Sequence, residues 1–141
     1  MADRVVLALG GGEVLTRVHT LEQLRQCVRR GLPFRAFEAV TANYGLPRPA
    51  VSQLMGTPER TLARRKHGTR FEAGESDRLV RLARIAALAE DVLGSRDKAG
   101  QWLQKGNRGL GGTTPLAHLD TDLGVVQVEQ ILGRIGHGIV G

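Results

Sequence analysis

A first candidate for chemistry is the glycine-rich loop at residues 106–112, which follows the only tryptophan, Trp102. The loop carries four glycines and runs into Thr-Thr-Pro, a pattern typical of a helix start. A glycine-rich loop before a helix can hold a phosphate on its backbone N–H groups. This loop lacks the Gly-Lys-Ser/Thr ending of a phosphate loop, and no hydrophobic strand precedes it. We therefore expect a shaped connecting loop that binds no phosphate.

A second glycine run lies near the start of the chain, in the segment VVLALGGGEVL at residues 5–15. Dinucleotide-binding folds begin with a hydrophobic strand and a glycine turn of this kind. Leu15 stands where the last glycine of that fingerprint is required, and no alternation of strands and helices follows. We expect residues 1–19 to form an N-terminal arm that is either loosely ordered or a single edge segment.

Side chains that catalyse reactions or bind metals are not grouped in this sequence. The four histidines are scattered, at positions 19, 67, 118 and 137, and no two have the spacing of a metal-binding helix face. No serine or cysteine has the neighbours of an activated nucleophile. The single cysteine, Cys27, excludes a disulfide within the chain and a cysteine-built metal site. We therefore expect no enzyme activity, no catalytic residue, no metal site and no cofactor.

The composition favours an all-α fold. Apolar residues make up 41% of the chain and aromatic residues only 4%, so the core must consist mainly of leucine, valine, isoleucine and alanine. At 141 residues the chain is one domain, or two small domains that share a core. No apolar run approaches the roughly 18 residues that a membrane span needs. Together with the lone cysteine, this predicts a cytoplasmic protein without membrane contact.

Positive charge is concentrated in the first 84 residues. Residues 58–84 carry eight basic and four acidic residues, and residues 1–57 carry seven and four. Residues 85–141 carry five basic and six acidic residues. Seven of the eight basic residues in the central segment are arginine, the side chain that pairs best with phosphates and guanine edges. The charge indicates either a nucleic-acid partner or a solvated basic face.

Helix signals punctuate the sequence from residue 20 onward. Expected start signals are Thr20 with Gln23, Thr57 with Pro58, Ser76, Ser95, and Thr114 with Pro115, and Gly94 is an expected end. Apolar residues at 79, 82, 83, 86, 89 and 93 form a stripe on one long helix. A second inward stripe consists of Val125, Val128, Ile131, Leu132 and Ile135. The expected helices cover about 21–30, 33–45, 48–56, 57–68, 75–94, 95–106, 114–119 and 121–138.

The segment RPAVSQLMGTPERTLARRKHG, residues 48–68, has the pattern of a helix-turn-helix. A short helix ends at Gly56, and a basic helix follows that would lie in the major groove of DNA. The alternative is an ordinary helical hairpin with a basic surface. The expected base contacts are Glu59, Arg60 and Ala63, and the expected phosphate contacts are Arg64, Arg65, Lys66 and Arg70.

Residues 60–138 resemble the Xre/MbcA/ParS-type bacterial antitoxins. The matching pieces are RTLARR, ESDRLVRLAR, the trio Ala99, Trp102 and Leu103, LGGTTPLAHLDT, and GRIGHG, in the order and spacing of the family. Each piece is short, but together they are specific and cover more than half of the chain. Residues 1–19 match no motif of the family.

The resemblance implies an Xre-like helix-turn-helix region at residues 20–74, followed by a small helical toxin-binding domain at residues 75–141. It also implies an NAD-consuming RES-domain toxin as partner and repression of the protein's own operon. The glycine loop then belongs to the toxin-binding domain, and Trp102 either packs beneath it or faces the partner. The expected toxin contacts from this part of the chain are Trp102, Leu110, Gly111 and Gly112.

The tail GRIGHGIVG, residues 133–141, consists of small residues and carries a terminal carboxylate. We hypothesise that it enters the NAD pocket of the toxin, where basic groups that bind pyrophosphate attract an anion. His137, Ile139, Val140 and Gly141 would then block the substrate, unless the tail is simply a frayed terminus. For repression we expect a homodimer on an inverted repeat, within a larger toxin–antitoxin complex. The alternatives are a helix-turn-helix regulator without a toxin partner and a small enzyme that uses the glycine loops.

Overall fold

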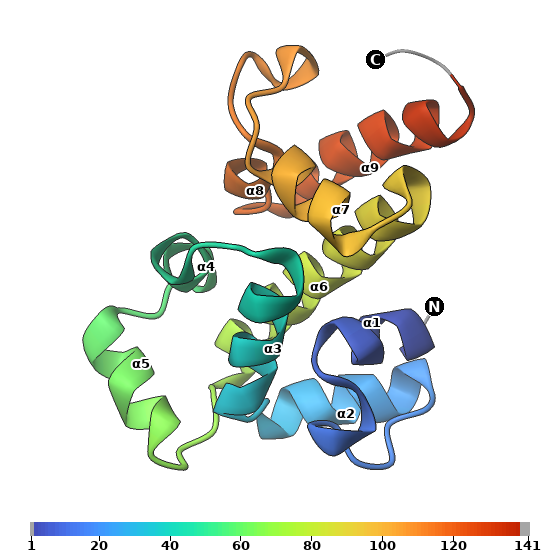
Figure 1. The fold of residues 1–141 in the computed structure, drawn as a ribbon. Coiled ribbons are helices and arrows are strands. Elements are labelled where there is room, and N and C mark those ends of the chain that lie inside the picture. The colour runs from blue at the N-terminus through green and yellow to red at the C-terminus, as the bar shows by residue number, and fades with distance from the viewer. Residues whose placement is uncertain (1, 139–141) are drawn as a thin grey trace.

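The computed structural model describes residues 2–138, and every regular element in that range is helical (Figure 1). The prediction of an all-α fold is therefore confirmed. The α-helices are α1 (Ala2–Ala8), α2 (Leu21–Arg30), α3 (Phe34–Tyr44), α4 (Arg48–Met55), α5 (Glu59–Lys66), α6 (Ala73–Leu93), α7 (Arg96–Leu103), α8 (Pro115–His118) and α9 (Asp122–Gly136). Two short 3₁₀ turns, η1 (Gly11–Glu13) and η2 (Arg108–Leu110), complete the set.

Helix α6 is the centre of the fold, and α1, α2, α3, α4, α7 and α9 all pack against it (Figure 1). The apolar stripe predicted from the sequence is confirmed, because its members Leu79, Leu82 and Ala83 are fully buried. Ile85 and Ala87 lie outside that stripe and are buried as well. The stripe therefore predicts fewer buried residues on α6 than the structure has, because other helices cover this helix on several sides.

Most of the helix boundaries follow the predicted local signals. Thr20 and Gln23 form a reciprocal capping box at the start of α2. The Ser95 hydroxyl accepts a hydrogen bond from the Lys98 N–H and caps α7. Gly94, in the left-handed conformation with φ 97°, ends α6 as predicted.

Two predicted helix starts are wrong. The hydroxyl of Thr57 does not cap α5 but donates to the carboxylate of Glu75, at 2.5 Å. Ser76 lies inside α6, which begins earlier, at Ala73. Its hydroxyl oxygen accepts a hydrogen bond from the N–H of Leu32 at 2.8 Å. Both hydroxyl groups could cap a helix, but each forms its hydrogen bond with a residue distant in sequence instead.

The expectation of a loosely ordered arm or edge segment at residues 1–19 is also wrong. Helix α1 packs on α6, and Val5 and Leu9 belong to the hydrophobic core. Gly10 ends this helix with φ 110°, and a side chain there would meet Val14 at 2.4 Å. The glycine run is therefore a helix stop and a tight turn. An unbroken apolar run has no helical period, so the packing against α6 decides its structure.

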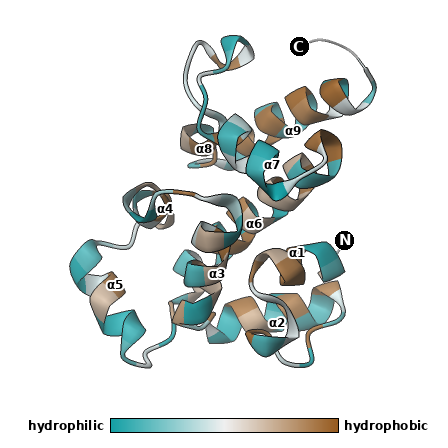
Figure 2. Ribbon diagram, in the orientation of Figure 1, coloured by the Kyte–Doolittle hydropathy of each residue, from teal (hydrophilic) through white to brown (hydrophobic). Residues whose placement is uncertain are grey.

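A single hydrophobic core extends from α1 to α9. Three of its aromatic side chains, Phe34, Phe37 and Phe71, pack together with ring centroids 5.5–6.4 Å apart. Figure 2 shows hydrophobic faces directed inward on α6 and α9, whereas α5 is mainly hydrophilic. Only Leu62 of α5 is buried. This helix is thus attached to the core by little apolar surface.

Candidate nucleic-acid interface and partner-binding region

Helices α4 and α5 form the helix-turn-helix that the sequence predicts. Gly56, with φ 71°, ends α4, and its N–H bonds to the carbonyl of Gln53. The hydroxyl of Ser52 donates to the carbonyl of Thr57 across the turn. On the α6 side, Arg78 Nη1 donates to the carbonyl of Met55 at 2.9 Å. These bonds hold the turn, so α5 leaves it in a defined direction.

Three of the predicted contact residues are on the solvent side of α5. Arg60, Arg64 and Lys66 are exposed, and within residues 2–138 none of them forms an ion pair. The guanidinium of Arg64 is 3.3 Å from the hydroxyl of Thr61, a neutral partner that leaves its charge available. Such free cations are suited to phosphate oxygens and base edges.

Arg65 has a different role from the predicted phosphate contact. Its side chain is only 12% exposed, and Nη2 lies 3.0 Å from Oε1 of Glu75. Oε1 of Glu72 is 3.8 Å from the same nitrogen. Arg65 is the next residue after Arg64, so it points about 100° around the helix, toward α6. Its charge is neutralised inside the protein by these carboxylates, so Arg65 is not presented to DNA as a phosphate contact.

The remaining predicted contact, Arg70, follows α5 in the loop toward α6. It is exposed, and its Nη1 donates to the carbonyl of Gly31 at 2.9 Å. The partner is neutral, so Arg70 keeps its positive charge at the surface in a fixed position. It remains a predicted phosphate contact.

Sequence reasoning missed Arg48, the first residue of α4. It is exposed and lies over the rings of Phe34 and Phe37, at 5.7 and 5.3 Å from their centroids. With Glu59 and Lys66 it lines a surface groove of about 420 Å³ beside α5. A lone arginine at a helix start gives no signal by itself. Only the folded chain brings Arg48 next to the basic helix.

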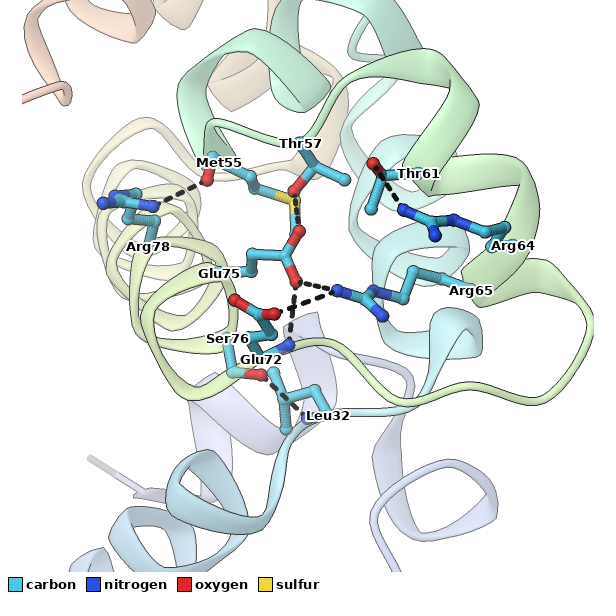
Figure 3. A network of polar contacts seen from close by, with 10 residues as sticks. All are labelled: Leu32, Met55, Thr57, Thr61, Arg64, Arg65, Glu72, Glu75, Ser76 and Arg78. Carbon is cyan, nitrogen blue, oxygen red and sulfur yellow. Dashed lines mark hydrogen bonds and ion pairs between the residues drawn. The ribbon is translucent and has the colours of Figure 1, made fainter.

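The carboxylate of Glu75 was also missed, and it links α5 to α6 (Figure 3). It accepts from the hydroxyl of Thr57 at 2.5 Å, from Arg65 at 3.0 Å and from the N–H of Glu72 at 2.8 Å. Burial alone raises the pKa of a carboxyl, but these hydrogen bonds outweigh it and lower the pKa of Glu75. The spacing of Glu72 and Glu75 is that of a capping box, which is the one signal the sequence held.

The glycine loop is closed on itself. The N–H of Asn107 donates to the carbonyl of Thr113, and the N–H of Gly112 donates to the carbonyl of Asn107, both at 2.9 Å. The N–H groups of Gly109, Leu110, Gly111 and Thr113 also bond within the loop. Donors that are used in this way are not free to hold a phosphate. The geometry supports the interpretation of a shaped connecting loop.

The predicted partner contacts separate into buried and exposed groups. Leu110 is buried in the core. Trp102 is half-buried and packs against the same core. Gly111 and Gly112 are exposed, with φ of 69° and 90°. His137 is exposed after the end of α9. Ile139, Val140 and Gly141 lie outside the described residues.

Comparisons with known proteins match both halves of this structure. Residues 23–84 match the antitoxin Xre-like helix-turn-helix domain, and residues 88–138 match the antitoxin Xre/MbcA/ParS C-terminal toxin-binding domain. Antitoxin Xre of Photorhabdus laumondii is 35% identical over 119 residues, which cover 83% of this chain and 80% of that protein. The chain belongs to the Xre/MbcA/ParS antitoxin family.

Two further family members support the assignment. Antitoxin Xre of Yersinia enterocolitica is 30% identical over 114 residues, 79% of this chain and 77% of its own length. Antitoxin Xre of Pseudomonas putida is 43% identical over 82 residues, 57% and 52% of the two chains. The family domains identify DNA and a toxin as the two partner classes.

The junction between the two family domains falls inside α6. The first match ends at residue 84 and the second begins at residue 88, both within Ala73–Leu93. One continuous helix therefore serves the DNA-binding half and the toxin-binding half of this family member. None of the helices in residues 2–138 is long and apolar enough to cross a membrane.

Proposed function

We propose that this antitoxin binds and neutralises a cognate NAD-consuming RES-domain toxin and represses its own operon. The observation that carries the proposal is the pairing, in one chain, of an exposed basic helix-turn-helix with a matched toxin-binding domain. The RES partner comes from the resemblance of residues 60–138 to antitoxins of such toxins. The action is by binding rather than by catalysis. Because both proposed partners, operator DNA and the toxin, are inside the cell, we place its site of action in the cytoplasm.

We place the operator contacts within residues 20–74 and the toxin contacts on parts of the surface within residues 75–141. Helix α5 would enter the major groove, with Arg60 near its N-terminus at base edges. The expected phosphate contacts are Arg48, Arg64, Lys66 and Arg70, all of them exposed. A homodimer on an inverted repeat fits the two-fold symmetry that such operators share with their proteins.

For the toxin we propose contacts from the glycine loop and from the segment that follows α9. Gly111 and Gly112 present exposed backbone, while Leu110 anchors the loop in the core and Trp102, on α7, packs against the same core. On α9, Leu123 has 78% of its surface exposed and Val126 has 46%. Exposed apolar side chains within a matched toxin-binding domain support a protein partner there.

The closing segment from His137 to Gly141 is proposed to obstruct the NAD pocket of the toxin. His137 directly follows α9, so the segment begins within the matched toxin-binding domain. An apolar pair, Ile139 and Val140, would displace the nucleotide by filling its site.

Co-expression with the product of the adjacent open reading frame tests the proposal. A tagged copy of this chain is purified, and its co-purifying protein is identified and sized together with it. A stable complex with a RES-domain protein is expected. Binding to upstream DNA without any such complex would instead favour a helix-turn-helix regulator that has no toxin partner.

A further inference from the structure

Glu75 is a buried carboxylate that neither of the proposed contact surfaces uses. Only 7% of the residue is exposed, and both carboxylate oxygens are occupied (Figure 3). Oε2 accepts from the hydroxyl of Thr57, and Oε1 accepts from Arg65 and from the N–H of Glu72. The three donors belong to the turn of the helix-turn-helix, to α5 and to the start of α6. One side chain thus joins three segments of the fold.

Helix α5 has fewer buried residues than any other described helix of eight residues or more, so it depends most on its polar contacts with Glu75 and the turn. It has eight residues, of which only Leu62 is buried, and it packs on α3 and α4. By contrast, α6 has nine buried residues and is held by helices from both halves of the chain. The pair of Arg65 and Glu75 attaches the weakly packed helix to this central one. With an apolar anchor of one residue, the direction of α5 is set by polar contacts.

We propose that Glu75 is a positioning residue for DNA recognition, which holds the turn and α5 at the angle that places Arg60 and Arg64 on the operator. A buried ion pair holds its two partners in one arrangement, because separating them leaves each charge unpaired in the low-dielectric interior. The link runs through α6, the element shared by both family domains. This inference rests on the proposed operator binding and adds the residue that orients the contact surface.

The substitution Glu75→Gln distinguishes a positioning role from simple electrostatics, because the two predict opposite changes in the affinity for the operator. It removes one negative charge near the basic helix, which by electrostatics alone strengthens binding to any DNA. Loss of the ion pair frees Arg65 and α5, which by positioning weakens binding to the operator. Contacts to phosphates at random sequence tolerate a tilted helix better than contacts to base edges do.

The matched control is Glu90→Gln, the same change on the same helix. Its carboxylate is also structural, since it accepts from the hydroxyl of Tyr44 at 2.8 Å and lies 3.7 Å from Arg96. These partners are on α3 and α7 rather than on α5. Both variants change the net charge equally, so any difference between them reports the place of the carboxylate.

The experiment measures the binding of the full chain to a duplex from upstream of its own gene and to a random duplex, across salt concentrations. For Glu75→Gln we expect the operator-to-random affinity ratio to fall about tenfold, the cost of one lost base contact, with an unchanged salt slope. The ratio for Glu90→Gln should equal that of the wild type. Toxin binding should be unchanged in both variants, which a general loss of fold would not allow.

An unchanged ratio in a folded Glu75→Gln variant, or an equal gain on both duplexes, would overturn the proposal. If that variant fails to fold, Thr57→Val removes a single hydrogen bond and should lower the ratio about threefold. Arg65→Gln should lower the operator-to-random ratio as much as Glu75→Gln does, and combining the two substitutions should lower it no further. A salt slope reduced by about one in Arg65→Gln would show a direct phosphate contact and contradict the inference. Failure of the wild type to select the operator would refute the proposed repression itself.

Discussion

Arg78 on α6 donates a hydrogen bond from Nη1 to the carbonyl of Met55, the last residue of α4, at 2.9 Å. The last carbonyls of a helix have no partner within it and carry partial negative charge, so a guanidinium is favourable there. The bond joins the central helix to the point where the first helix of the helix-turn-helix ends. The turn at Gly56 therefore rests on α6 from one side, while Glu75 holds it from another through Thr57.

Replacing Arg78 by leucine should lower the free energy of unfolding by about 1–2 kcal/mol, because the Met55 carbonyl loses a charged donor. Urea denaturation followed by circular dichroism measures this difference. Arg29→Leu on the exposed face of α2 is the control and should change stability by less than about 0.5 kcal/mol. Equal losses in the two variants would mean that the bond to Met55 contributes nothing specific.

Charge reversal at Arg64 should weaken binding to all DNA sequences alike. The side chain is exposed and unpaired among residues 2–138, so it should act on phosphates, and Arg64→Glu should flatten the dependence of affinity on salt. Titrations of operator and random duplexes at several salt concentrations measure both effects. Arg108→Glu makes the same charge change on η2 and should leave the salt slope as it is. Lost specificity with an unchanged slope would place Arg64 at base edges instead.

Two glycine-to-alanine substitutions in helices should have opposite effects on stability. A side chain at Gly100 would approach the Tyr44 carbonyl oxygen to 1.9 Å, so α7 must move away from α3. Alanine there should cost about 1–3 kcal/mol despite its better helix propensity. At Gly133 in α9 nothing lies within 4 Å, and alanine should stabilise by about 0.5–1 kcal/mol. Thermal denaturation compares the two, and a stabilised Gly100→Ala would contradict the close approach of α7 and α3.

The buried carboxylate of Glu75 should make stability depend on acid. Its pKa in the folded protein lies below its ordinary value of 4.5, so the ionised form favours folding. That contribution is present above the ordinary pKa and is lost as the pH falls through the folded value. Urea unfolding at pH 7 and at acidic pH should show a smaller decline for Glu75→Gln than for the wild type. Glu38→Gln, a change at an exposed position on α3, should lose stability in acid as the wild type does. An equal loss of stability between the two pH values in all three proteins would refute the hydrogen bonds of Glu75 to Thr57 and Arg65.

Removal of residues 137–141 should leave the fold intact and impair neutralisation of the toxin. The deletion begins beyond Gly136, the last residue of α9, and removes none of the core residues described within residues 2–138. The measurement is the rate of NAD consumption by the purified toxin, titrated with truncated and full-length antitoxin. Complete inhibition by the truncated protein at equal concentration would exclude obstruction by this segment and leave the glycine loop as the inhibitory contact.

Local signals in the sequence were sufficient for most of the secondary structure. The capping box of Thr20 and Gln23, the stop at Gly94 and the cap at Ser95 all act between residues at most four positions apart. Signals of this range are visible in a single sequence. The helix-turn-helix follows from them, because its turn requires the left-handed glycine at position 56.

Features that depend on distant partners were not predictable. Arg64 and Arg65 are identical neighbours, and only the position of Glu75 on α6 decides which one is exposed. Thr57 has the residue type of a cap but bonds to the same carboxylate. Arg48 gains its place from rings in α3. In each case the sequence shows a group with suitable chemistry, and tertiary contacts select its partner.

Neutralisation of the toxin is tested by the NAD content of cells that express the adjacent open reading frame, alone or together with this antitoxin. We expect NAD to fall when the partner is expressed alone and to stay at its normal level when both are present. An antitoxin with Glu90→Gln, outside the proposed contacts, should protect like the wild type. Steady NAD with the partner alone, or an equal fall with and without this chain, would contradict neutralisation of an NAD-consuming toxin.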